Sequence, residues 1–363
     1  MINNLYTVDV SVSLDGENTG KTHQFYGIGN YDKGSAASTW SGKILKTVEI
    51  NDSTTNGPVL NNGDWFGGQV TNIGDLDGDG VNDLAVAAWG DDKCADGEDT
   101  CDIRGAVHIM YMNTDGSVKS TVEINDSTAN GPTLQNESYF GRGVTNIGDL
   151  DGDGVNDLAV GDAKGGGDWD GAVHIMFMNT DGSIKSSVEI NDDTTNGPDL
   201  DEGDLFGISI ANMGDLNGDS VDDLVVGAKQ DDAGSGDNKG AVHIMYMNSD
   251  GSVKSTVEIN DDTTNGPVLT NSHDKFGQDI ANIGDLDGDG VNDMIVSAYL
   301  SDCVDCTGQN AGSAHILFIN SDGSVKSTVE INDSTTNGPV IIATDNFGQS
   351  VANVGDLNGD GVN

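Results

Sequence analysis

The sequence predicts an all-β fold in which a four-stranded antiparallel unit is repeated around an axis, a β-propeller of about five blades. Three observations predict it. The sequence repeats with a period of about 70 residues, and each repeat holds four short apolar segments separated by turn residues. Gly is abundant at 52 of 363 residues, whereas Pro is scarce at 5. No segment has the apolar spacing of a helix.

A Phe-Gly pair opens each repeat, and successive pairs stand 66 to 74 residues apart. These pairs are Phe66-Gly67, Phe140-Gly141, Phe206-Gly207, Phe276-Gly277 and Phe347-Gly348. We therefore divide the chain into N-terminal strands at 1–37, which match the repeat poorly, and a repeat region at 38–363. The repeat region comprises a partial unit at 38–65, repeats at 66–139, 140–205, 206–275 and 276–346, and a truncated repeat at 347–363.

The four apolar segments predict one strand each. In the first full repeat, GxxVTNI follows Phe-Gly and LAVAA follows an acidic loop. The third segment, 106–112, is almost entirely apolar, as expected for a strand covered on both faces. Thr-Asp-Gly then predicts a tight hairpin turn, because Gly readily adopts positive φ. The fourth segment, 119–124, alternates apolar and polar residues, which predicts a half-exposed outer strand.

Two arrangements of the blades follow from the chain ends. In a closed ring of five, strands at Leu5–Leu14, His23–Ile28 and Lys43–Ile50 would share the last blade with Phe347–Val354. In the alternative, the chain forms an arc of a larger ring of about seven blades. We expect the arc, because the acidic motif of the last repeat is cut at Asn363.

The charge of the chain excludes several partners. There are 61 acidic and 15 basic residues, giving a formal net charge of −46. Such a surface repels nucleic acids and anionic membranes. No apolar run approaches the ~20 residues of a transmembrane helix, and the N-terminus lacks the pattern of a signal peptide. Most of the acidic residues recur at fixed positions of the repeat, which indicates bound cations rather than disorder.

The acidic residues form a nine-residue loop, DLDGDGVND, after the first strand of each repeat. Carboxylates at positions 1, 3, 5 and 9 and the carbonyl at position 7 could surround one hard cation, and Gly at 4 and 6 permits the tight curl. The predicted ligands are Asp75, Asp77, Asp79, Val81 and Asp83; Asp149, Asp151, Asp153, Val155 and Asp157; Asp215, Asn217, Asp219, Val221 and Asp223; Asp285, Asp287, Asp289, Val291 and Asp293; and, in the truncated copy, Asp356, Asn358, Asp360 and Val362.

Calcium is the cation that these loops favour. Mg²⁺ tends to keep its own waters, and Zn²⁺ prefers Cys and His ligands. An EF-hand would need a bidentate Glu at position 12, where the full copies have Val86, Val160, Val226 and Val296. We therefore predict four complete Ca²⁺ sites and a fifth, truncated one. Because clustered carboxylates repel one another without metal, binding should be coupled to folding.

Taken together, these motifs resemble FG-GAP repeats, the cation-binding blades of integrin α-subunits, from Phe66 to the C-terminus. The resemblance implies a propeller with Ca²⁺ loops between the first two strands of each blade, on an extracellular protein. The chain departs from the family in having Gly-Ala-Val for Gly-Ala-Pro, near-identical blades and no inserted ligand-binding domain. Near-identical blades are more similar to secreted bacterial or algal repeat proteins that share this module.

Repeated His and paired Cys residues have structural interpretations. His108, His174, His243 and His315 occupy one position of the third strand, and we expect them to pack within their blades rather than to form a ring of metal ligands. The cysteines lie in variable loops, where short-range disulfides are expected in a secreted protein, while a CxxC redox centre or a shared zinc is disfavoured. These residues are Cys94, Cys101, Cys303 and Cys306.

Two functions from different classes fit the sequence. The first is a Ca²⁺-stabilised extracellular or cell-surface module, part of a larger polypeptide, that binds a protein or glycan ligand in adhesion. Its contact surface would be the variable loops Gly90–Arg104, Asp162–Asp170, Lys229–Lys239 and Ser301–Ala311. The second is the propeller part of a secreted polysaccharide lyase or phospholipase. The sequence shows no catalytic motif, so we expect no enzyme activity.

Overall fold

A computed structural model describes residues 9–11, 46–91, 103–166, 169–232, 238–269, 271–302 and 310–356. These residues form no helix and four sheets of four antiparallel strands each, which confirms the predicted fold class. We call the sheets blades 1 to 4 in chain order. Their strands are β3 (Phe66–Gly74), β4 (Asp83–Ala88), β5 (Ala106–Met112) and β6 (Val118–Ile124); β7 (Phe140–Asn146), β8 (Leu158–Asp162), β9 (Ala172–Met178) and β10 (Ile184–Ile190); β11 (Phe206–Gly214), β12 (Asp223–Ala228), β13 (Ala241–Met247) and β14 (Val253–Ile259); and β15 (Phe276–Gly284), β16 (Asp293–Ala298), β17 (Ser313–Ile319) and β18 (Val325–Ile331).

Two further strands lie outside the blades. β1 (Asp9–Ser11) pairs in parallel with β2 (Thr47–Glu49), whereas all pairs within a blade are antiparallel. The predicted strand at His23–Ile28 lies outside the described residues, and Phe347–Val354 carries no strand. The antiparallel closing blade of a five-bladed ring is therefore not formed by the described residues.

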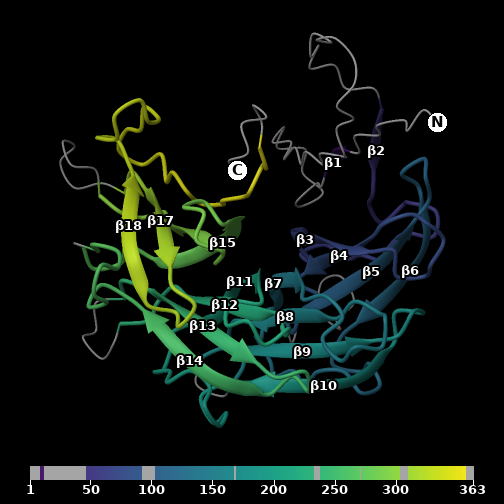
Figure 1. Cartoon of the computed structure of the whole chain (residues 1–363). Helices are drawn as coiled ribbons and strands as arrows, with labels where there is room; N and C mark the ends of the chain where they lie inside the picture. Colours follow the sequence, from purple (N-terminus) through teal and green to yellow (C-terminus); the bar gives the residue numbers. More distant parts are fainter. Residues whose placement is uncertain are drawn as a thin grey trace, which may run out of the picture.

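The blades are arranged side by side around a common axis (Figure 1). The first strand of each blade is innermost, and β3, β7, β11 and β15 contact one another in sequence. The second, third and fourth strands follow outward, as Figure 1 shows for β7, β8, β9 and β10. In blade 1 every residue of β5 is buried, while β6 has an exposed middle, as the sequence predicted.

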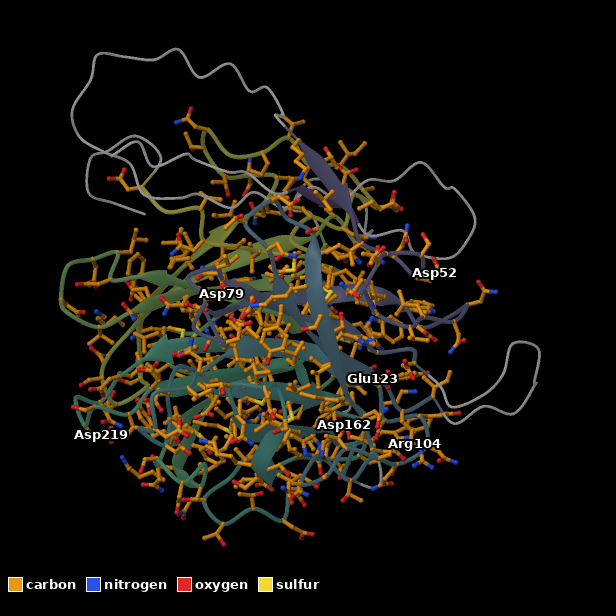
Figure 2. The ribbon with its side chains drawn as sticks, turned by 90° about the vertical axis from the view of Figure 1, so that its right-hand side faces the viewer. Asp52, Asp79, Arg104, Glu123, Asp162 and Asp219 are labelled. Carbon is orange, nitrogen blue, oxygen red and sulfur yellow. The ribbon has the colours of Figure 1, made fainter. Side chains whose placement is uncertain are left out.

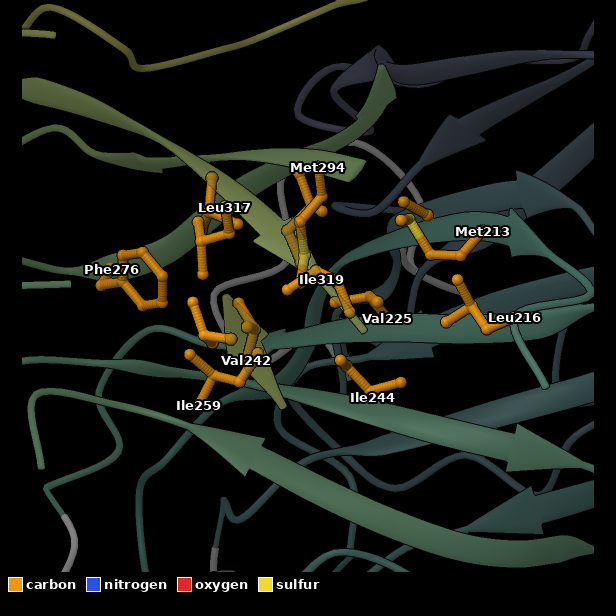
Figure 3. Close-up of a cluster of buried hydrophobic side chains, with 14 of the residues drawn as sticks. Met213, Leu216, Val225, Val242, Ile244, Ile259, Phe276, Met294, Leu317 and Ile319 are labelled. Atoms are coloured by element: carbon orange, nitrogen blue, oxygen red, sulfur yellow. The ribbon is translucent and has the colours of Figure 1, made fainter. Parts of the chain in front are cut away.

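The hydrophobic core lies between neighbouring blades rather than inside any one of them. Between blades 3 and 4, for example, Val242 and Ile244 of β13 face Met294 and Leu317 of the next blade (Figure 3). Similar clusters lie between blades 1 and 2 and between blades 2 and 3. Each blade therefore buries its apolar face only by stacking on the next, as expected for a repeat protein.

The Phe-Gly and Gly-Ala pairs are explained by close contact between blades. Gly207 has a φ of +88°, and a Cβ there would lie 2.4 Å from the carbonyl oxygen of Ala172 in the preceding blade. Gly171 has a φ of +100°, and its Cβ would lie 2.1 Å from the carbonyl oxygen of Phe206. Only Gly fits both the backbone conformation and the space at these positions. The backbone N–H of Phe206 donates to the carbonyl of Asp170 at 2.8 Å and so joins the blades.

A ladder of Asn side chains also joins the innermost strands. In each repeat after the first, the side-chain amide of one Asn donates to the backbone carbonyl of the equivalent Asn in the preceding repeat, at 3.0–3.3 Å. The ladder runs through Asn72, Asn146, Asn212, Asn282 and Asn353. Asn353 belongs to the truncated repeat at 347–363. The backbone N–H of Phe347 likewise donates to the carbonyl of Ala311 at 2.8 Å. The start of the truncated repeat therefore contacts blade 4 in the same way as the earlier blades contact one another.

Candidate metal centre

Each acidic loop connects the innermost strand of a blade to the second strand. In blade 1, β3 ends at Gly74 and β4 begins at Asp83, so the loop lies at one end of the blade. The Asp75 carboxylate accepts backbone N–H bonds from Asp79 at 2.9 Å and from Gly80 at 2.8 Å, which curls the loop around it. Gly78 and Gly80 have φ values of +75° and +88°, the left-handed region that the predicted curl requires.

The curl brings carboxylates together. Ligand oxygens of Asp75, Asp77 and Asp83 all lie within 4.8 Å of one another. Clusters of three carboxylates also occur in blade 2, from the same loop positions 1, 3 and 9, and in blade 4, from positions 1, 3 and 5. Among the described residues these are the groups of three or more potential metal ligands. Those of blades 2 and 4 consist of Asp149, Asp151 and Asp157, and of Asp285, Asp287 and Asp289. Such oxygen-only clusters suit a hard divalent cation.

The ninth loop position is buried and anchors the loop. One Asp83 oxygen accepts the N–H of Leu76 and the other accepts the N–H of Met112 at the end of β5, both at 2.9 Å. The corresponding bonds are present in the other three blades. Burial raises the pKa of Asp157 and of Asp223 to about 6. A carboxylate has about four acceptor positions, so these bonds leave room for a cation.

A lysine of the outermost strand approaches each loop. The Lys119 ammonium on β6 contacts Asp77 and Asp79 Oδ2, both at 2.6 Å, and these bonds raise its pKa. The lysine therefore lies where positive charge is needed, against loop positions 3 and 5. Equivalent contacts join Lys185 to Asp151 and Asp153, Lys254 to Asp219, and Lys326 to Asp287 and Asp289. The sequence analysis missed these lysines, although their fixed place in the repeat was visible.

The loops differ in how many of their predicted ligands carry a charge. In blade 3, Asn217 replaces the third-position Asp, and Ser220, with a φ of +71°, replaces Gly. Its loop keeps the bonds from Asp219 and Ser220 N–H to Asp215, at 2.9 and 2.7 Å. Of the fifth loop, Asp356 is described, and Asn358, Asp360 and Val362 lie outside the described residues.

These observations agree with a divalent cation in the loops. Three carboxylates converge in each of blades 1, 2 and 4, and in all four blades a lysine ammonium bonds one or two Asp side chains of the loop. The identity of the cation, the number of sites and the carbonyls of Val81, Val155, Val221 and Val291 as ligands remain predictions.

The repeated histidines pack inside their blades. His108 is buried against the ring of Phe66, with ring centroids 5.5 Å apart, and burial lowers its pKa to about 4. The other three histidines make the same contact with their own Phe-Gly rings. They lie on third strands, two positions out from the axis, so they do not converge there. The four cysteines lie outside the described residues.

One buried trio occurs in blade 2. Ser138 Oγ donates to Asp162 Oδ2 at 2.9 Å, and His174 Nε2 lies 3.7 Å from the same oxygen. All three side chains are buried. A catalytic triad places His between Ser and the acid, whereas here the acid is in the middle. His174 therefore does not contact Ser138 as a general base would.

Comparison with known proteins agrees with these blades. A family model described as FG-GAP repeat matches residues 206–245 and 276–317. This chain contains FG-GAP repeats. Integrin alpha-4 of Xenopus laevis is 33% identical over 165 residues, which cover 46% of this chain and 15% of the relative. Integrin alpha pat-2 of Caenorhabditis elegans is 26% identical over 251 residues, covering 64% and 18%. Integrin alpha-PS2 of Drosophila melanogaster is 29% identical over 176 residues, covering 47% and 12%.

The FG-GAP matches fall on blades 3 and 4, each from its Phe-Gly pair into its third strand. The chain spans less than a fifth of the length of these three integrin α-subunits. In the part of the chain that the structure describes, no helix is long and apolar enough to cross a membrane.

Proposed function

We propose that this FG-GAP chain is a calcium-stabilised propeller module of an extracellular or cell-surface protein, within a larger polypeptide, that binds a protein or glycan ligand. The observation that carries the proposal is the recurrence of a carboxylate cluster in the same loop of blades 1, 2 and 4. The similarity to integrin α-subunits supports an adhesion-related role.

Bound calcium would stabilise the fold by compensating the negative charge of the loop carboxylates. The ligands would be the loop carboxylates, the Asn217 and Asn358 amides and the position-7 carbonyls of the predicted sites. When bound, the cation would offset the repulsion among carboxylates that the fold holds within 4.8 Å. Extracellular calcium modules bind at about 10⁻⁴–10⁻³ M, so millimolar calcium should load the loops.

We expect the ligand to bind at the end of the blades opposite the acidic loops. The loops between second and third strands lie there, because β4 runs away from the acidic loop at Asp83. In Figure 2, Asp79 and Asp219 of the acidic loops lie to the left of Arg104 and Asp162, which belong to this opposite end. We call it the variable end. A ligand-contact surface at the variable end would lie away from the acidic loops.

Chelation tests the calcium proposal. We expect the melting temperature of the full chain to fall by several degrees when calcium is replaced by a chelator, because ligands that bind only the folded state stabilise it. Asp77→Ala should remove one site among several in a calcium titration by calorimetry. Asp52→Ala, an exposed carboxylate outside the loops, is the matched control. Equal melting with calcium and with chelator would contradict the proposal.

Lys119→Met should have the opposite effect on affinity. The ammonium contacts two oxygens that the cation would use, so its removal should tighten calcium binding at the first loop by about three- to tenfold. In chelator the same variant should melt lower than the parent chain. Lys46→Met, which removes an exposed lysine paired with Asp115, is the control. Weaker calcium binding by Lys119→Met would identify the lysine as a support of the site rather than a competitor.

A further inference from the structure

A second cluster of side chains that do not repeat lies at the variable end. Trp65, Tyr139 and Lys275 directly precede innermost strands, while Lys229 and Tyr299 directly follow second strands. Trp89 follows β4 in the same way. These positions therefore surround the axis at the end opposite the acidic loops. Because they differ from blade to blade, packing common to all blades does not explain them.

The aromatic members form a row over blades 1 and 2. The ring centroids of Trp65 and Trp89 are 4.1 Å apart, and those of Trp89 and Tyr139 are 5.6 Å apart. Lys164 Nζ lies 4.5 Å from the Tyr139 centroid and 4.3 Å from that of Trp169. Trp65 and Trp169 are exposed at 44% and 50%. The tryptophans at the two ends of the row are thus partly exposed to solvent.

The basic members, Arg142, Lys229 and Lys275, form what we call the axial basic cluster. The Arg142 guanidinium lies 3.7 Å from the centroid of the Trp89 ring. Lys229 Nζ donates to Gln278 Oε1 at 2.9 Å. Lys275 is only 7% exposed, and its Nζ donates to Gln230 Oε1 at 3.1 Å. The partners of all three cations are therefore neutral amides or rings.

No carboxylate among the described residues forms an ion pair with these three cations. The lysines of the outermost strands differ, since each bonds at least one Asp. Burial lowers the pKa of Lys229 to about 8, and repulsion from the charges of Arg142 and Lys275 contributes to this shift. Buried charges in proteins are ordinarily paired. An anion supplied from outside would complete this cluster.

We propose that the axial basic cluster binds the carboxylates of an acidic polysaccharide, with the partly exposed indoles of Trp65 and Trp169 as stacking surfaces for the sugar rings. This inference rests on the proposed ligand-binding role of the module and names the class of its ligand. A guanidinium held on a ring is preorganised to donate two parallel N–H bonds to a carboxylate. Clustered positive charge would also attract an acidic ligand to a chain whose net charge of −46 otherwise repels it.

The exposed tryptophans favour a uronate chain over an acidic peptide. A pyranose ring has an apolar face of C–H groups that lies flat on an indole, while its carboxylate extends from the edge. Two such indoles, Trp65 and Trp169, end the aromatic row whose middle rings, Trp89 and Tyr139, lie beneath the Arg142 guanidinium. An acidic peptide such as hexaglutamate would use the cations but has no comparable face of C–H groups to place on the indoles.

The test uses the full chain in millimolar calcium and a hexamer of galacturonic acid as probe. Binding is followed by tryptophan fluorescence and by calorimetry. We expect the hexamer to bind and its fully methyl-esterified form, which has the same rings without the charges, to bind at least about tenfold more weakly. Hexaglutamate should also bind more weakly than the uronate. Equal binding of the ester, or tighter binding of hexaglutamate, would overturn the proposal.

Variants assign the binding to the axial basic cluster. Lys229→Met and Arg142→Met should each weaken uronate binding about tenfold or more, and Arg142→Lys should restore only part of it. Lys46→Met removes an exposed lysine remote from the cluster and should change affinity by less than about twofold. Melting curves show whether each variant folds. Uronate bound through calcium at the acidic loops would instead respond to Asp77→Ala and not to Lys229→Met, which would overturn the proposal.

The two proposals fail separately. The calcium proposal is judged by melting in chelator, which does not involve the sugar. The uronate proposal is judged by the ester comparison and by Lys229→Met, at fixed calcium. A chain that melts equally in chelator and still prefers the uronate would retain the second proposal only.

Discussion

At the residue scale, lysines play two different roles in this acidic chain. Lys119 and its equivalents bond loop carboxylates at one end of the blades. Lys229 and Lys275, at the other end, bond only glutamine amides. A paired cation stabilises the fold where it lies, whereas a partly buried cation without a counter-charge opposes folding. The same residue type therefore supports structure at one end and favours ligand binding at the other.

Lys229→Met should stabilise the chain at neutral pH. Burial and neighbouring cations lower the pKa of Lys229 from 10.5 to about 8, so the folded state holds its proton less tightly than the unfolded state does. Wild-type stability should therefore rise as the pH increases from about 8 toward 10.5. The gain from Lys229→Met should be about 2 kcal/mol near pH 7 and should shrink across that window.

Urea unfolding of both chains at a series of pH values between neutral and mildly alkaline measures this difference. Lys46→Met, which removes a charge paired at the surface, should show no such trend. A stability difference that stays constant with pH would show that the methionine acts through packing rather than through the missing counter-charge.

At the element scale, the strands were predictable and the bonds between blades were not. The apolar run at 106–112 and the alternation at 119–124 predicted the burial of β5 and β6, because side-chain period reports which faces are covered. The DLDGDGVND segment likewise predicted a curled loop. The Asn ladder depends on which strands become neighbours around the axis. A single repeat read along the chain contains no such information.

The same limit applies to the candidate sites. Asp75, Asp77 and Asp83 could be assigned because all three lie in one short loop. Lys119 comes to that loop from a strand about 40 residues later, through the register of the whole blade. The axial basic cluster joins residues from three blades, so only the assembled propeller places Arg142 near Lys229.

The Asn ladder should stabilise the contact between blades. Asn282 Nδ2 donates to the carbonyl of Asn212 in the preceding blade at 3.0 Å. Asn282→Ala should cost about 1 kcal/mol and should speed amide exchange in β15, at the boundary of blades 3 and 4. Asn320→Ala, which removes a bond to Ser324 within one turn, is the control. Hydrogen exchange read by mass spectrometry compares them, and equal effects on β15 would contradict a role between blades.

At the scale of the whole molecule, the carboxylate clusters and the axial basic cluster lie at opposite ends of the blades. The loops with their carboxylate clusters lie at one end, and Arg142, Lys229 and Lys275 lie at the other. The total of −46 means that electrostatic repulsion opposes the compact state wherever cations are missing. Five divalent cations would cancel ten of these charges, at the points where they are closest together.

This charge makes stability depend on salt when calcium is absent. The Debye length falls from about 30 Å at 0.01 M salt to about 3 Å at 1 M, so added salt screens repulsion between loops before it affects bonds within one loop. In chelator, the melting temperature should therefore rise by several degrees as NaCl increases over this range. With saturating calcium the increase should be much smaller, because the densest charges are already neutralised at contact distance. KCl should match NaCl if screening is the cause. A salt effect of the same size with and without calcium would mean that the repulsion lies elsewhere on the surface than in the acidic loops.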